Sequence, residues 1–216
     1  MIIVLIISYL IGSLNSAIIA TFVVSGKDIR DYGSKNAGLT NVYRCFGKTA
    51  AGLTLLIDIC KGFLVVLLAR LLFISGWFSY QDYDVVTVCG LAAVFAILGH
   101  VFPIFYKFHG GKGILIAGVC MLAIDPVVFL CEFVLFVLLV AITRYISVGS
   151  IACCFGYPLF TLIWQSVSNA YFGGVYECIL VHTLIALASG ILCFWRHMPN
   201  VKRLMSHTES KFSFKK

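Results

Sequence analysis

The chain has 216 residues, of which 61% are hydrophobic and 12% are charged, and its formal net charge is +7. Soluble domains contain about 45–50% apolar residues, so this composition excludes most soluble folds. It also excludes intrinsic disorder, which requires low hydrophobicity and high charge. Apolar blocks recur as far as Trp195. We therefore expect an all-α fold, a polytopic integral membrane protein.

Seven segments are candidate spans, because a transmembrane helix needs about 20 apolar residues. In chain order they are 1–24, 48–73, 85–105, 113–125, 127–143, 148–166 and 176–195. The fourth is short because Asp125-Pro126 stops it, so it is either a half-helix or part of a bent unit with the fifth. We expect a single transmembrane domain over 1–195, with catalytic loops 25–47, 106–113 and 144–150, and a tail over 196–216.

The basic residues predict the orientation of these spans, because Lys and Arg accumulate in cytoplasmic loops. Of the 16 Lys and Arg, 14 fall in loops or in the tail on one predicted side of the membrane, and the loops on the other side contain none. The N-terminus is therefore expected outside and the C-terminus in the cytoplasm. The basic residues form no soluble patch with interleaved aromatics, so nucleic acid is not an expected partner.

Cysteine and histidine spacing gives no sign of a metal or cofactor. The nine cysteines include no C-x-x-C pair, and most lie inside apolar runs, which is typical of small buried hydrophobic residues. No set of His and Cys has the spacing of a zinc site. We expect neither a metal nor a cofactor.

The loop over 25–47 has the composition of an anion-binding loop. Its glycines, hydroxyls and amides precede a guanidinium, that of Arg44, and curled backbone amides together with a guanidinium fork can hold a phosphate. The alternative is an ordinary turn with a positive-inside arginine. The candidate residues before Arg44 are Gly33, Ser34, Asn36, Gly38, Thr40 and Asn41.

A second candidate phosphate site lies at the start of the short fourth helix. Gly110, Gly111, Lys112 and Gly113 run directly into it, and free N–H groups at a helix start attract anions. The spacing is not that of a Walker A motif. The alternative is a flexible loop with one topogenic lysine.

Two further polar segments flank the last spans. Arg144, Ser147 and Ser150 mark the boundary before the sixth span. In the tail, Pro199 is expected to open a helix that places Asn200 and Arg203 on one face, with His197 beside them. A basic helix on the membrane surface is the alternative for this tail.

Charged residues also occur inside the apolar segments. Asp58 and Lys61 are spaced i, i+3 in the second span, so they can neutralise each other. This pair has either a structural or a functional role. Glu132, in the fifth span, has no evident partner in the sequence.

Taken together, these segments resemble the bacterial acyl-phosphate:glycerol-3-phosphate acyltransferase family (PlsY type). The resemblance covers nearly the whole chain. It is carried by Gly33-Ser34-x-Asn36-x-Gly38-x-Thr40-Asn41-x-x-Arg44, Asp58-x-x-Lys61-Gly62, Gly99-His100-x-x-Pro103, Phe108-x-Gly110-Gly111-Lys112-Gly113, Arg144-Tyr145-x-Ser147, His197-x-x-Asn200, Arg203-Leu204 and Glu209-x-Lys211.

The resemblance implies an enzyme and its substrates. The family transfers a fatty acyl group from acyl phosphate to the sn-1 hydroxyl of glycerol 3-phosphate, which gives lysophosphatidic acid and phosphate for phospholipid biosynthesis. It implies a location in the bacterial cytoplasmic (inner) membrane, with the active site on the cytoplasmic side. It also implies a functional link to a soluble enzyme that forms the acyl phosphate.

Roles for individual residues follow from the resemblance. Lys112, with the backbone of Gly110, Gly111 and Gly113, is expected to cradle glycerol 3-phosphate, helped by Arg44, Arg144 and Ser147. Ser34, Asn36 and Asn41 would orient the donor, and His197 and Asn200 the attacking hydroxyl. Either the donor phosphate or His197 would accept the proton. We expect the cytoplasmic loops to form one cationic pocket.

Three departures from the family pattern accompany these expectations. Lys35 stands where a glycine is usual, Ile114-Leu115-Ile116 replaces Val-Ala-Thr, and Asn15 replaces a proline in the first span.

The rival interpretations are a small-solute transporter with Asp58 and Lys61 as coupling residues, and a structural membrane subunit. The transporter interpretation is weakened because the phosphate-binding chemistry is predicted on one side of the membrane only.

Overall fold

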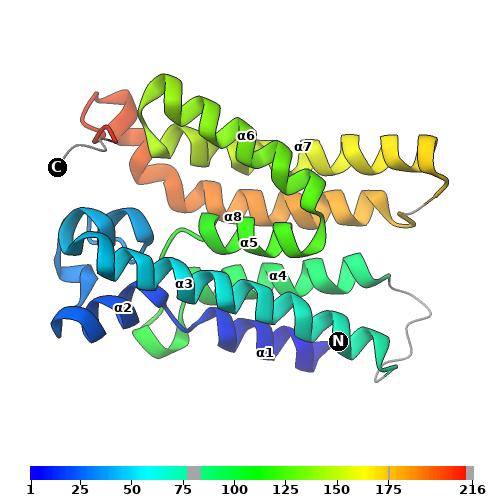
Figure 1. Cartoon of the computed structure of the whole chain (residues 1–216), viewed down its shortest axis with the longest axis horizontal. Coiled ribbons are helices and arrows are strands. Elements are labelled where there is room, and N and C mark those ends of the chain that lie inside the picture. Colours follow the sequence, from blue (N-terminus) through cyan, green and yellow to red (C-terminus); the bar gives the residue numbers. More distant parts are fainter. Residues whose placement is uncertain (77–83, 175, 213–216) are drawn as a thin grey trace. The chain divides into compact units, whose positions relative to one another are not determined.

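The computed structural model of the chain describes residues 1–76, 84–174 and 176–212, and every regular element in these ranges is helical (Figure 1). The chain divides into two compact units, Met1–Ile124 (unit 1) and Asp125–Lys216 (unit 2). The predicted organisation, one transmembrane domain over 1–195 with a tail over 196–216, stays a prediction. The all-helical prediction is confirmed for the described residues.

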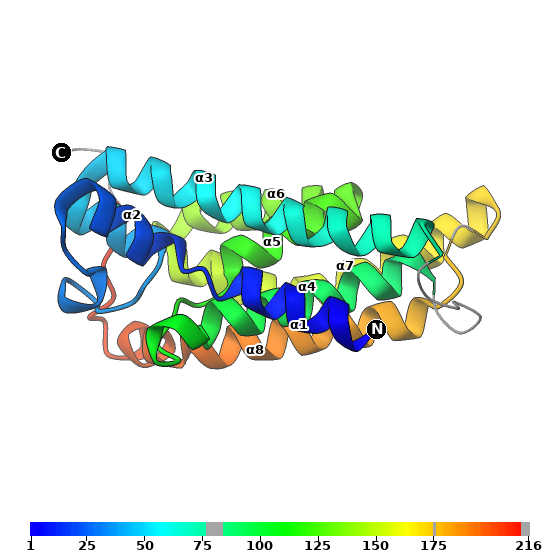
Figure 2. The same ribbon diagram turned by 90° about the horizontal axis from the view of Figure 1, so that it is seen from below.

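Unit 1 is a bundle built around the long helix α3. Helix α1 packs against α4, α2 and α5 pack against α3, and α3 packs against α4 (Figures 1 and 2). The elements are α1 (Ile2–Gly12), α2 (Ser16–Ser25), η1 (Ile29–Asp31), α3 (Leu39–Ile74), α4 (Val85–Val101), η2 (Ile104–Tyr106) and α5 (Ile114–Ile124).

The first predicted span is not one continuous helix. Helix α1 ends at Gly12 and α2 begins at Ser16, because Asn15 has an extended backbone and its side chain accepts a hydrogen bond from the backbone N–H of Ile18 at 3.1 Å. Asparagine is a favoured N-cap, so the departure from proline at this position still starts a helix. The predicted span over 1–24 is thus built from two helices, and Ile2–Ser25 is long and apolar enough to cross a membrane.

Helix α3 bends at Gly47, and its second part covers the predicted span over 48–73. Gly47 has φ 77° and ψ −166° inside the helix, a conformation that glycine adopts at low cost. Helix α5 has 11 residues, about 16 Å at 1.5 Å per residue. It is therefore much shorter than the hydrocarbon core of about 30 Å.

Two glycines let α1 and α4 approach backbone to backbone. A Cβ atom built on Gly12 would overlap the backbone carbonyl of Ala96, and one built on Gly99 would overlap the carbonyl of Tyr9. Small residues at helix contacts of this kind are typical of membrane proteins. This contact fixes the start of the chain on α4, whose end carries His100.

Unit 2 contains three long helices, with α7 (Ile146–Phe172) packed against both α6 (Pro126–Thr143) and α8 (Ile179–Met205). Asp125 caps α6 by accepting a hydrogen bond from the N–H of Val128 at 3.3 Å, and Pro126 occupies the first turn. The predicted stop at Asp125-Pro126 is confirmed. Pro199 lies inside α8, so the prediction that it opens a new helix was wrong.

A proline and a glycine shape the contact between α7 and α8. Pro158 lies inside α7 and has no N–H to donate to the carbonyl four residues earlier, that of Cys154. A Cβ atom built on Gly190 of α8 would overlap this same carbonyl oxygen. The Cys154 carbonyl, which receives no hydrogen bond from Pro158, therefore faces Gly190, and glycine leaves room for it because it has no side chain.

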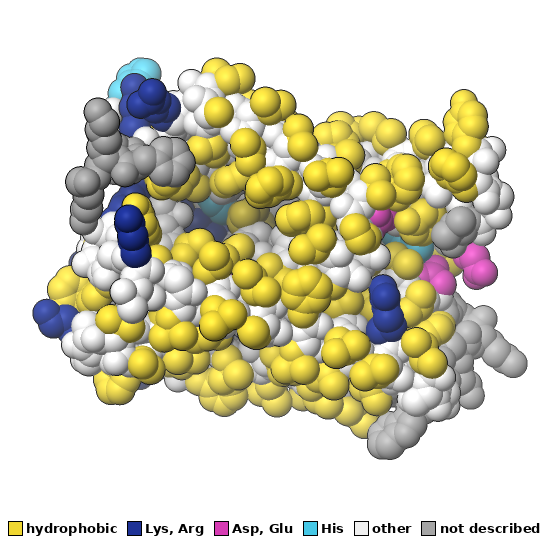
Figure 3. All heavy atoms as spheres, viewed as in Figure 1, with side chains coloured by type: hydrophobic (Ala, Val, Ile, Leu, Met, Phe, Trp, Pro, Cys, Tyr) yellow, Lys and Arg dark blue, Asp and Glu magenta, His cyan; other side chains and the backbone are white. Residues whose placement is uncertain are grey.

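Five described helical segments are long and apolar enough to cross a membrane, and neither α3 nor α5 is among them. Hydrophobic side chains cover much of the visible surface along the helices of each unit (Figure 3). These features, by length and composition, support a multi-pass membrane protein. Seven spans and the orientation of the termini stay predictions. The five segments are Ile2–Ser25, Val85–Tyr106, Pro126–Thr143, Ile146–Phe172 and Ile179–Met205.

Candidate functional site

The first loop of unit 1 is held from inside by the carboxamide of Asn41, a buried side chain. Its Oδ1 accepts a hydrogen bond from the N–H of Ser34 at 3.0 Å, and its Nδ2 donates to the carbonyls of Tyr32 at 3.0 Å and Asn36 at 3.1 Å. Both amide hydrogens are thus used by the backbone. Asn41 shapes the loop that presents Ser34 and Asn36, whereas the family resemblance implied that Asn41 itself orients the acyl donor.

Left-handed backbone at two positions explains part of the glycine pattern in this loop. Gly33 has φ 57°, and a Cβ atom there would overlap the Asn41 carboxamide oxygen. Lys35 has φ 58°, in the region where glycine is favoured and other residues cost about 1–2 kcal/mol. This conformation gives a physical reason for the glycine that the resembled family has at this position.

Arg44 lies in the short first part of α3, between the N-cap Gly38 and the bend at Gly47. Its side chain is exposed, as is that of Ser34, while Thr40 is half-buried. The first backbone amides of a helix have no partner within it and attract anions. This part of the chain therefore combines a helix start with a guanidinium.

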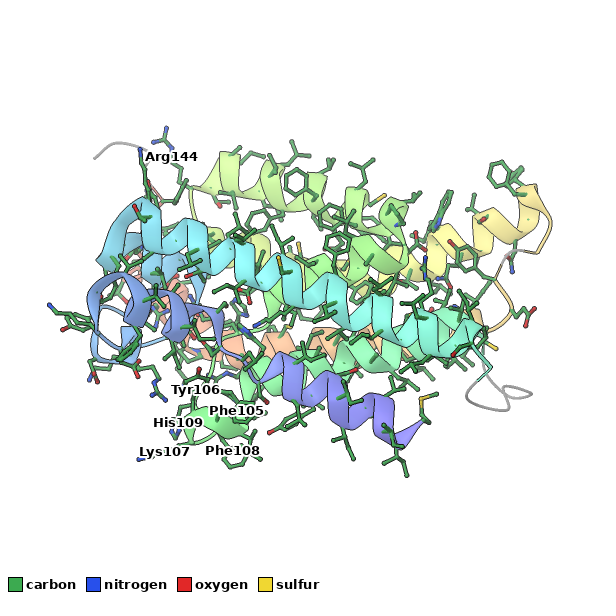
Figure 4. The ribbon with its side chains drawn as sticks, turned by 60° about the horizontal axis from the view of Figure 1, so that its bottom comes forward. Phe105, Tyr106, Lys107, Phe108, His109 and Arg144 are labelled. Carbon is green, nitrogen blue, oxygen red and sulfur yellow. The ribbon has the colours of Figure 1, made fainter. Side chains whose placement is uncertain are left out.

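Arg30, which was not among the candidate residues predicted from the sequence, connects the first loop to the loop after α4. Its guanidinium pairs with Asp28 at 2.6 Å and donates to the carbonyl of Tyr106 at 2.9 Å. The hydrogen bonds from Arg30 hold the pKa of Asp28 below its usual value. Figure 4 labels the segment that is anchored in this way, in which Tyr106 packs against the apolar core of unit 1. The other labelled residues of this segment are exposed: Phe105, Lys107, Phe108 and His109.

The second predicted phosphate loop uses its glycine amides differently from the prediction. Gly110 N–H donates to the carbonyl of Val101 at 3.2 Å, and Gly111 N–H donates to the carbonyl of His100 at 3.1 Å. These two amides are therefore not the free donors that the sequence predicted. The loop is instead bound to the end of α4, and it places Lys112, half-buried, just before α5.

Gly111 is also where the two loops of unit 1 meet. A Cβ atom built on it would overlap His100 Nε2 on one side and lie 2.6 Å from the carbonyl oxygen of Ala37 on the other. Ala37 comes two residues before the start of α3, and Gly111 comes three residues before the start of α5. The starts of both helices, with Arg44 on one and Lys112 before the other, are thus brought together.

In unit 2, the predicted residues at the start of α7 are placed by a sharp junction with α6. Arg144 has φ 60°, ends α6 and is exposed, and Figure 4 shows it at the end of the helix. Ser147 and Ser150 lie in the first turns of α7 and are buried. The tail returns to this junction, because Phe212 N–H donates to the Arg144 carbonyl at 2.7 Å.

Glu209, which was noted in the sequence only as part of a motif, joins the tail to the end of α8. Its carboxylate accepts hydrogen bonds from Asn200 Nδ2 at 2.8 Å and from Arg203 Nε at 2.6 Å. Burial opposes ionisation of Glu209, but the hydrogen bonds from Arg203 and Asn200 and the charge of Arg203 outweigh it and lower its pKa. Asn200 and Arg203 do share a face, although α8 runs without a break through Pro199.

His197 lies on the same helix end and is buried. Its Nδ1 is 2.8 Å from the carbonyl oxygen of Cys193. A carbonyl only accepts hydrogen bonds, so Nδ1 carries the hydrogen and Nε2 of the neutral ring is the basic nitrogen. The ring therefore has the tautomer that a proton acceptor at Nε2 requires.

The charged residues that the sequence places inside predicted spans belong to different units. In unit 1, Lys61 Nζ lies 2.7 Å from Asp58 Oδ1, so the i, i+3 ion pair is present. In unit 2, Glu132 is buried against Gly156 of α7, where a Cβ atom would overlap its Oε1. Its carboxyl oxygens have no hydrogen-bond partner within the described residues.

The predicted residues are therefore grouped within each unit. Unit 1 holds Gly33, Ser34, Asn36, Gly38, Thr40, Asn41, Arg44, Asp58, Lys61, Gly110, Gly111, Lys112 and Gly113, and unit 2 holds Arg144, Ser147, Ser150, His197 and Asn200.

Comparison with known proteins gives a consistent result over the length of the chain. The family model described as glycerol-3-phosphate acyltransferase matches residues 2–207. A glycerol-3-phosphate acyltransferase of Chlorobaculum tepidum is 35% identical, over 98% of this chain and 96% of the relative. One of Clostridioides difficile is also 35% identical, over 100% of this chain and 97% of the relative.

A solved structure has the same fold. The crystal structure of PlsY, an integral membrane glycerol 3-phosphate acyltransferase in its glycerol 3-phosphate form, matches with a TM-score of 0.76 and 28% identity, over 98% of this chain and 95% of PlsY. The recognition made from the loops is therefore confirmed. The chain belongs to the PlsY-type glycerol-3-phosphate acyltransferase family of integral membrane proteins.

Proposed function

We propose that this protein transfers a fatty acyl group from acyl phosphate to the sn-1 hydroxyl of glycerol 3-phosphate, at the cytoplasmic side of the bacterial inner membrane. PlsY has been solved in a glycerol 3-phosphate form and in a lysophosphatidic acid form, which supports this acceptor and this product. The observation that carries the proposal is the meeting of the two loops at Gly111 and Ala37. It brings two helix starts together, one bearing Arg44 and one preceded by Lys112.

The roles in unit 1 follow from charge. Both substrates carry phosphate, and a lysine, an arginine and helix starts are the groups that bind phosphate. Lys112 binds the phosphate of glycerol 3-phosphate, and Arg44 neutralises phosphate beside it. Ser34 and Asn36, presented by the loop that Asn41 holds, orient the acyl donor.

The reaction needs little activation from the protein. The acceptor oxygen attacks the acyl carbonyl carbon, the bond from that carbon to the phosphate oxygen breaks, and phosphate leaves as a stable anion. Donors aimed at the developing oxyanion and positioning of the two substrates supply most of the acceleration. The hydroxyl proton goes to the departing phosphate or to His197.

The tautomer of His197 supports this residue as the proton acceptor, because its Nδ1 donates to the Cys193 carbonyl and leaves Nε2 basic. A pH profile of kcat/KM distinguishes His197 from the donor phosphate as the proton acceptor. If His197 accepts the proton, kcat/KM falls as acid protonates this histidine, and this fall is absent from the residual activity of His197→Ala. An identical profile in the variant assigns the proton to the donor phosphate.

A donor comparison tests the proposed function. Purified protein in lipid is given glycerol 3-phosphate with acyl phosphate or with acyl-CoA, and product formation is measured with each. Transfer from acyl phosphate alone supports the proposal and a functional link to a soluble enzyme that makes this donor. Transfer from acyl-CoA alone contradicts it. Uptake of glycerol 3-phosphate into vesicles without any transfer would favour the transporter interpretation.

A further inference from the structure

Lys61 forms the centre of a buried polar cluster in unit 1 that the proposed chemistry does not use. Its Nζ lies 2.7 Å from Asp58 Oδ1, 2.9 Å from His100 Nδ1 and 3.1 Å from the carbonyl oxygen of Leu14. Lys61, Asp58 and His100 are all buried. The ammonium group donates to the Leu14 carbonyl and to His100 Nδ1, and it forms an ion pair with Asp58.

These three contacts come from three different segments. Leu14 lies at the break between α1 and α2, Asp58 lies on α3 one turn from Lys61, and His100 lies near the end of α4. The carbonyl of Leu14 is available because the N–H of Ile18 donates to the side chain of Asn15. Lys61 therefore connects the break in the first span to α4.

The lysine also fixes the tautomer of His100. An ammonium can only donate, so Nδ1 of His100 accepts and the hydrogen of the neutral ring is on Nε2. This is the opposite of His197, whose Nδ1 donates to a carbonyl. His100 and His197 thus have different tasks, because the basic nitrogen of His100 is occupied by Lys61.

The other side of the His100 ring faces the loop that carries Lys112. A Cβ atom on Gly111 would overlap Nε2, and the N–H of Gly111 donates to the His100 carbonyl at 3.1 Å. The Ala37 carbonyl closes the opposite side of Gly111. The ring orientation set by Lys61 therefore limits where Gly111, and with it Lys112, can lie.

We propose that Lys61 and His100 are positioning residues, which hold the Gly110–Lys112 loop in place for binding glycerol 3-phosphate. This inference rests on the proposed function. The Asp58 and Lys61 charges cancel, so the cluster adds no net charge for the substrate. Its effect is geometric, and misplacing a binding group by about 1 Å can reduce a rate by about 100-fold.

The test uses two substitutions of His100 that keep different halves of the ring. In His100→Asn the side-chain oxygen replaces Nδ1 as the acceptor for Lys61, but nothing replaces Nε2 beside Gly111. In His100→Gln the longer amide reaches toward Gly111 and Lys61 loses its acceptor. The matched control is Arg70→Met, which removes a basic side chain of α3 that donates to the Ala123 carbonyl at 3.3 Å, outside this cluster.

We expect His100→Asn to melt close to the wild type and to raise the KM for glycerol 3-phosphate at least about tenfold, with the KM for acyl phosphate unchanged. His100→Gln is expected to melt lower and to raise that KM less, and Arg70→Met to leave it unchanged. A purely structural role would lower the melting temperature or the amount of active protein and leave KM unchanged.

An unchanged KM for glycerol 3-phosphate in folded His100→Asn overturns the inference while the proposed function stands. If His100→Asn does not fold, an unchanged KM in His100→Gln together with a lowered melting temperature overturns it as well. A wild-type protein that transfers no acyl group from acyl phosphate overturns the proposed function, and the inference with it.

Discussion

At the residue scale, Arg44 and Lys112, the two cations of unit 1 that are proposed to bind phosphate, lie outside the predicted apolar spans, so their removal separates catalysis from membrane insertion. Lys112→Ala and Arg44→Ala should each lower kcat/KM by about 100-fold or more, as expected when one partner of a charged, hydrogen-bonded contact is removed. Phosphate release by purified variants checks this. Lys48→Ala, an exposed basic residue on the same helix as Arg44, is the control and should remain active. Wild-type activity in either site variant would refute its role.

Gly111 gives a second prediction at this scale. In Gly111→Ala the new methyl group would overlap His100 Nε2 and press on the Ala37 carbonyl, and overpacking of this kind costs about 1–3 kcal/mol. We expect a lower melting temperature and loss of glycerol 3-phosphate binding. Gly52→Ala is the control, because a Cβ atom on Gly52 of α3 meets nothing within 4 Å. Equal behaviour of the two variants would argue against the contact.

At the element scale, the contact between α7 and α8 depends on one glycine. Gly190→Ala would push a methyl group against the Cys154 carbonyl, so α8 must move away from α7. The melting temperature should fall by several degrees, because about 1 kcal/mol corresponds to roughly 2–4 °C in a chain of this size. A thiol-reactive dye measures this by the increase over its labelling of the folded protein, because Cys154 and Cys193 are buried in the fold while Cys45, Cys60 and Cys131 are exposed. A melting curve like that of the wild type would contradict the close approach.

The end of α8 gives a pH prediction. The pKa of Glu209 is lowered from 4.5 in the folded protein, so its stabilising effect is complete above about pH 4.5 and is lost as the pH falls through the lower, folded value. At pH 7, Glu209→Gln should loosen the tail, at a cost of up to about 1 kcal/mol because Arg203 is partly exposed. Limited proteolysis of the tail checks this. The difference from the wild type should shrink at acid pH, and a difference that grows there would contradict the assignment.

At the scale of the whole molecule, the apolar runs predicted most of the helices, because a membrane-spanning helix is recognised from the length and hydrophobicity of a segment. The stop at Asp125-Pro126 was also predictable, since its cap and proline are local signals. The break at Asn15 was missed, because a single side-chain hydrogen bond to Ile18 does not change the hydropathy of the segment. Pro199 was misinterpreted because it is tolerated inside α8.

The sequence predicted which residues belong to the candidate site better than it predicted what each of them does. Lys112 and Arg44 could be selected because phosphate requires cations, and Asp58 with Lys61 because of their spacing. The use of the Gly110 and Gly111 amides by the end of α4, and of the Asn41 amide by its own loop, depends on how each loop folds back on nearby backbone, which residue type and spacing do not reveal. Glu209 was not selected for the same reason, since its partners Asn200 and Arg203 are known only once the tail folds back.

The central claim, that acyl phosphate is the donor and glycerol 3-phosphate the acceptor, is tested most directly by following one reaction with phosphorus NMR. Purified protein in lipid receives both substrates. We predict that acyl phosphate disappears only when glycerol 3-phosphate is present, and that inorganic phosphate and lysophosphatidic acid appear in equal amounts. Phosphate released without lysophosphatidic acid, or no consumption of acyl phosphate at all, would contradict the account.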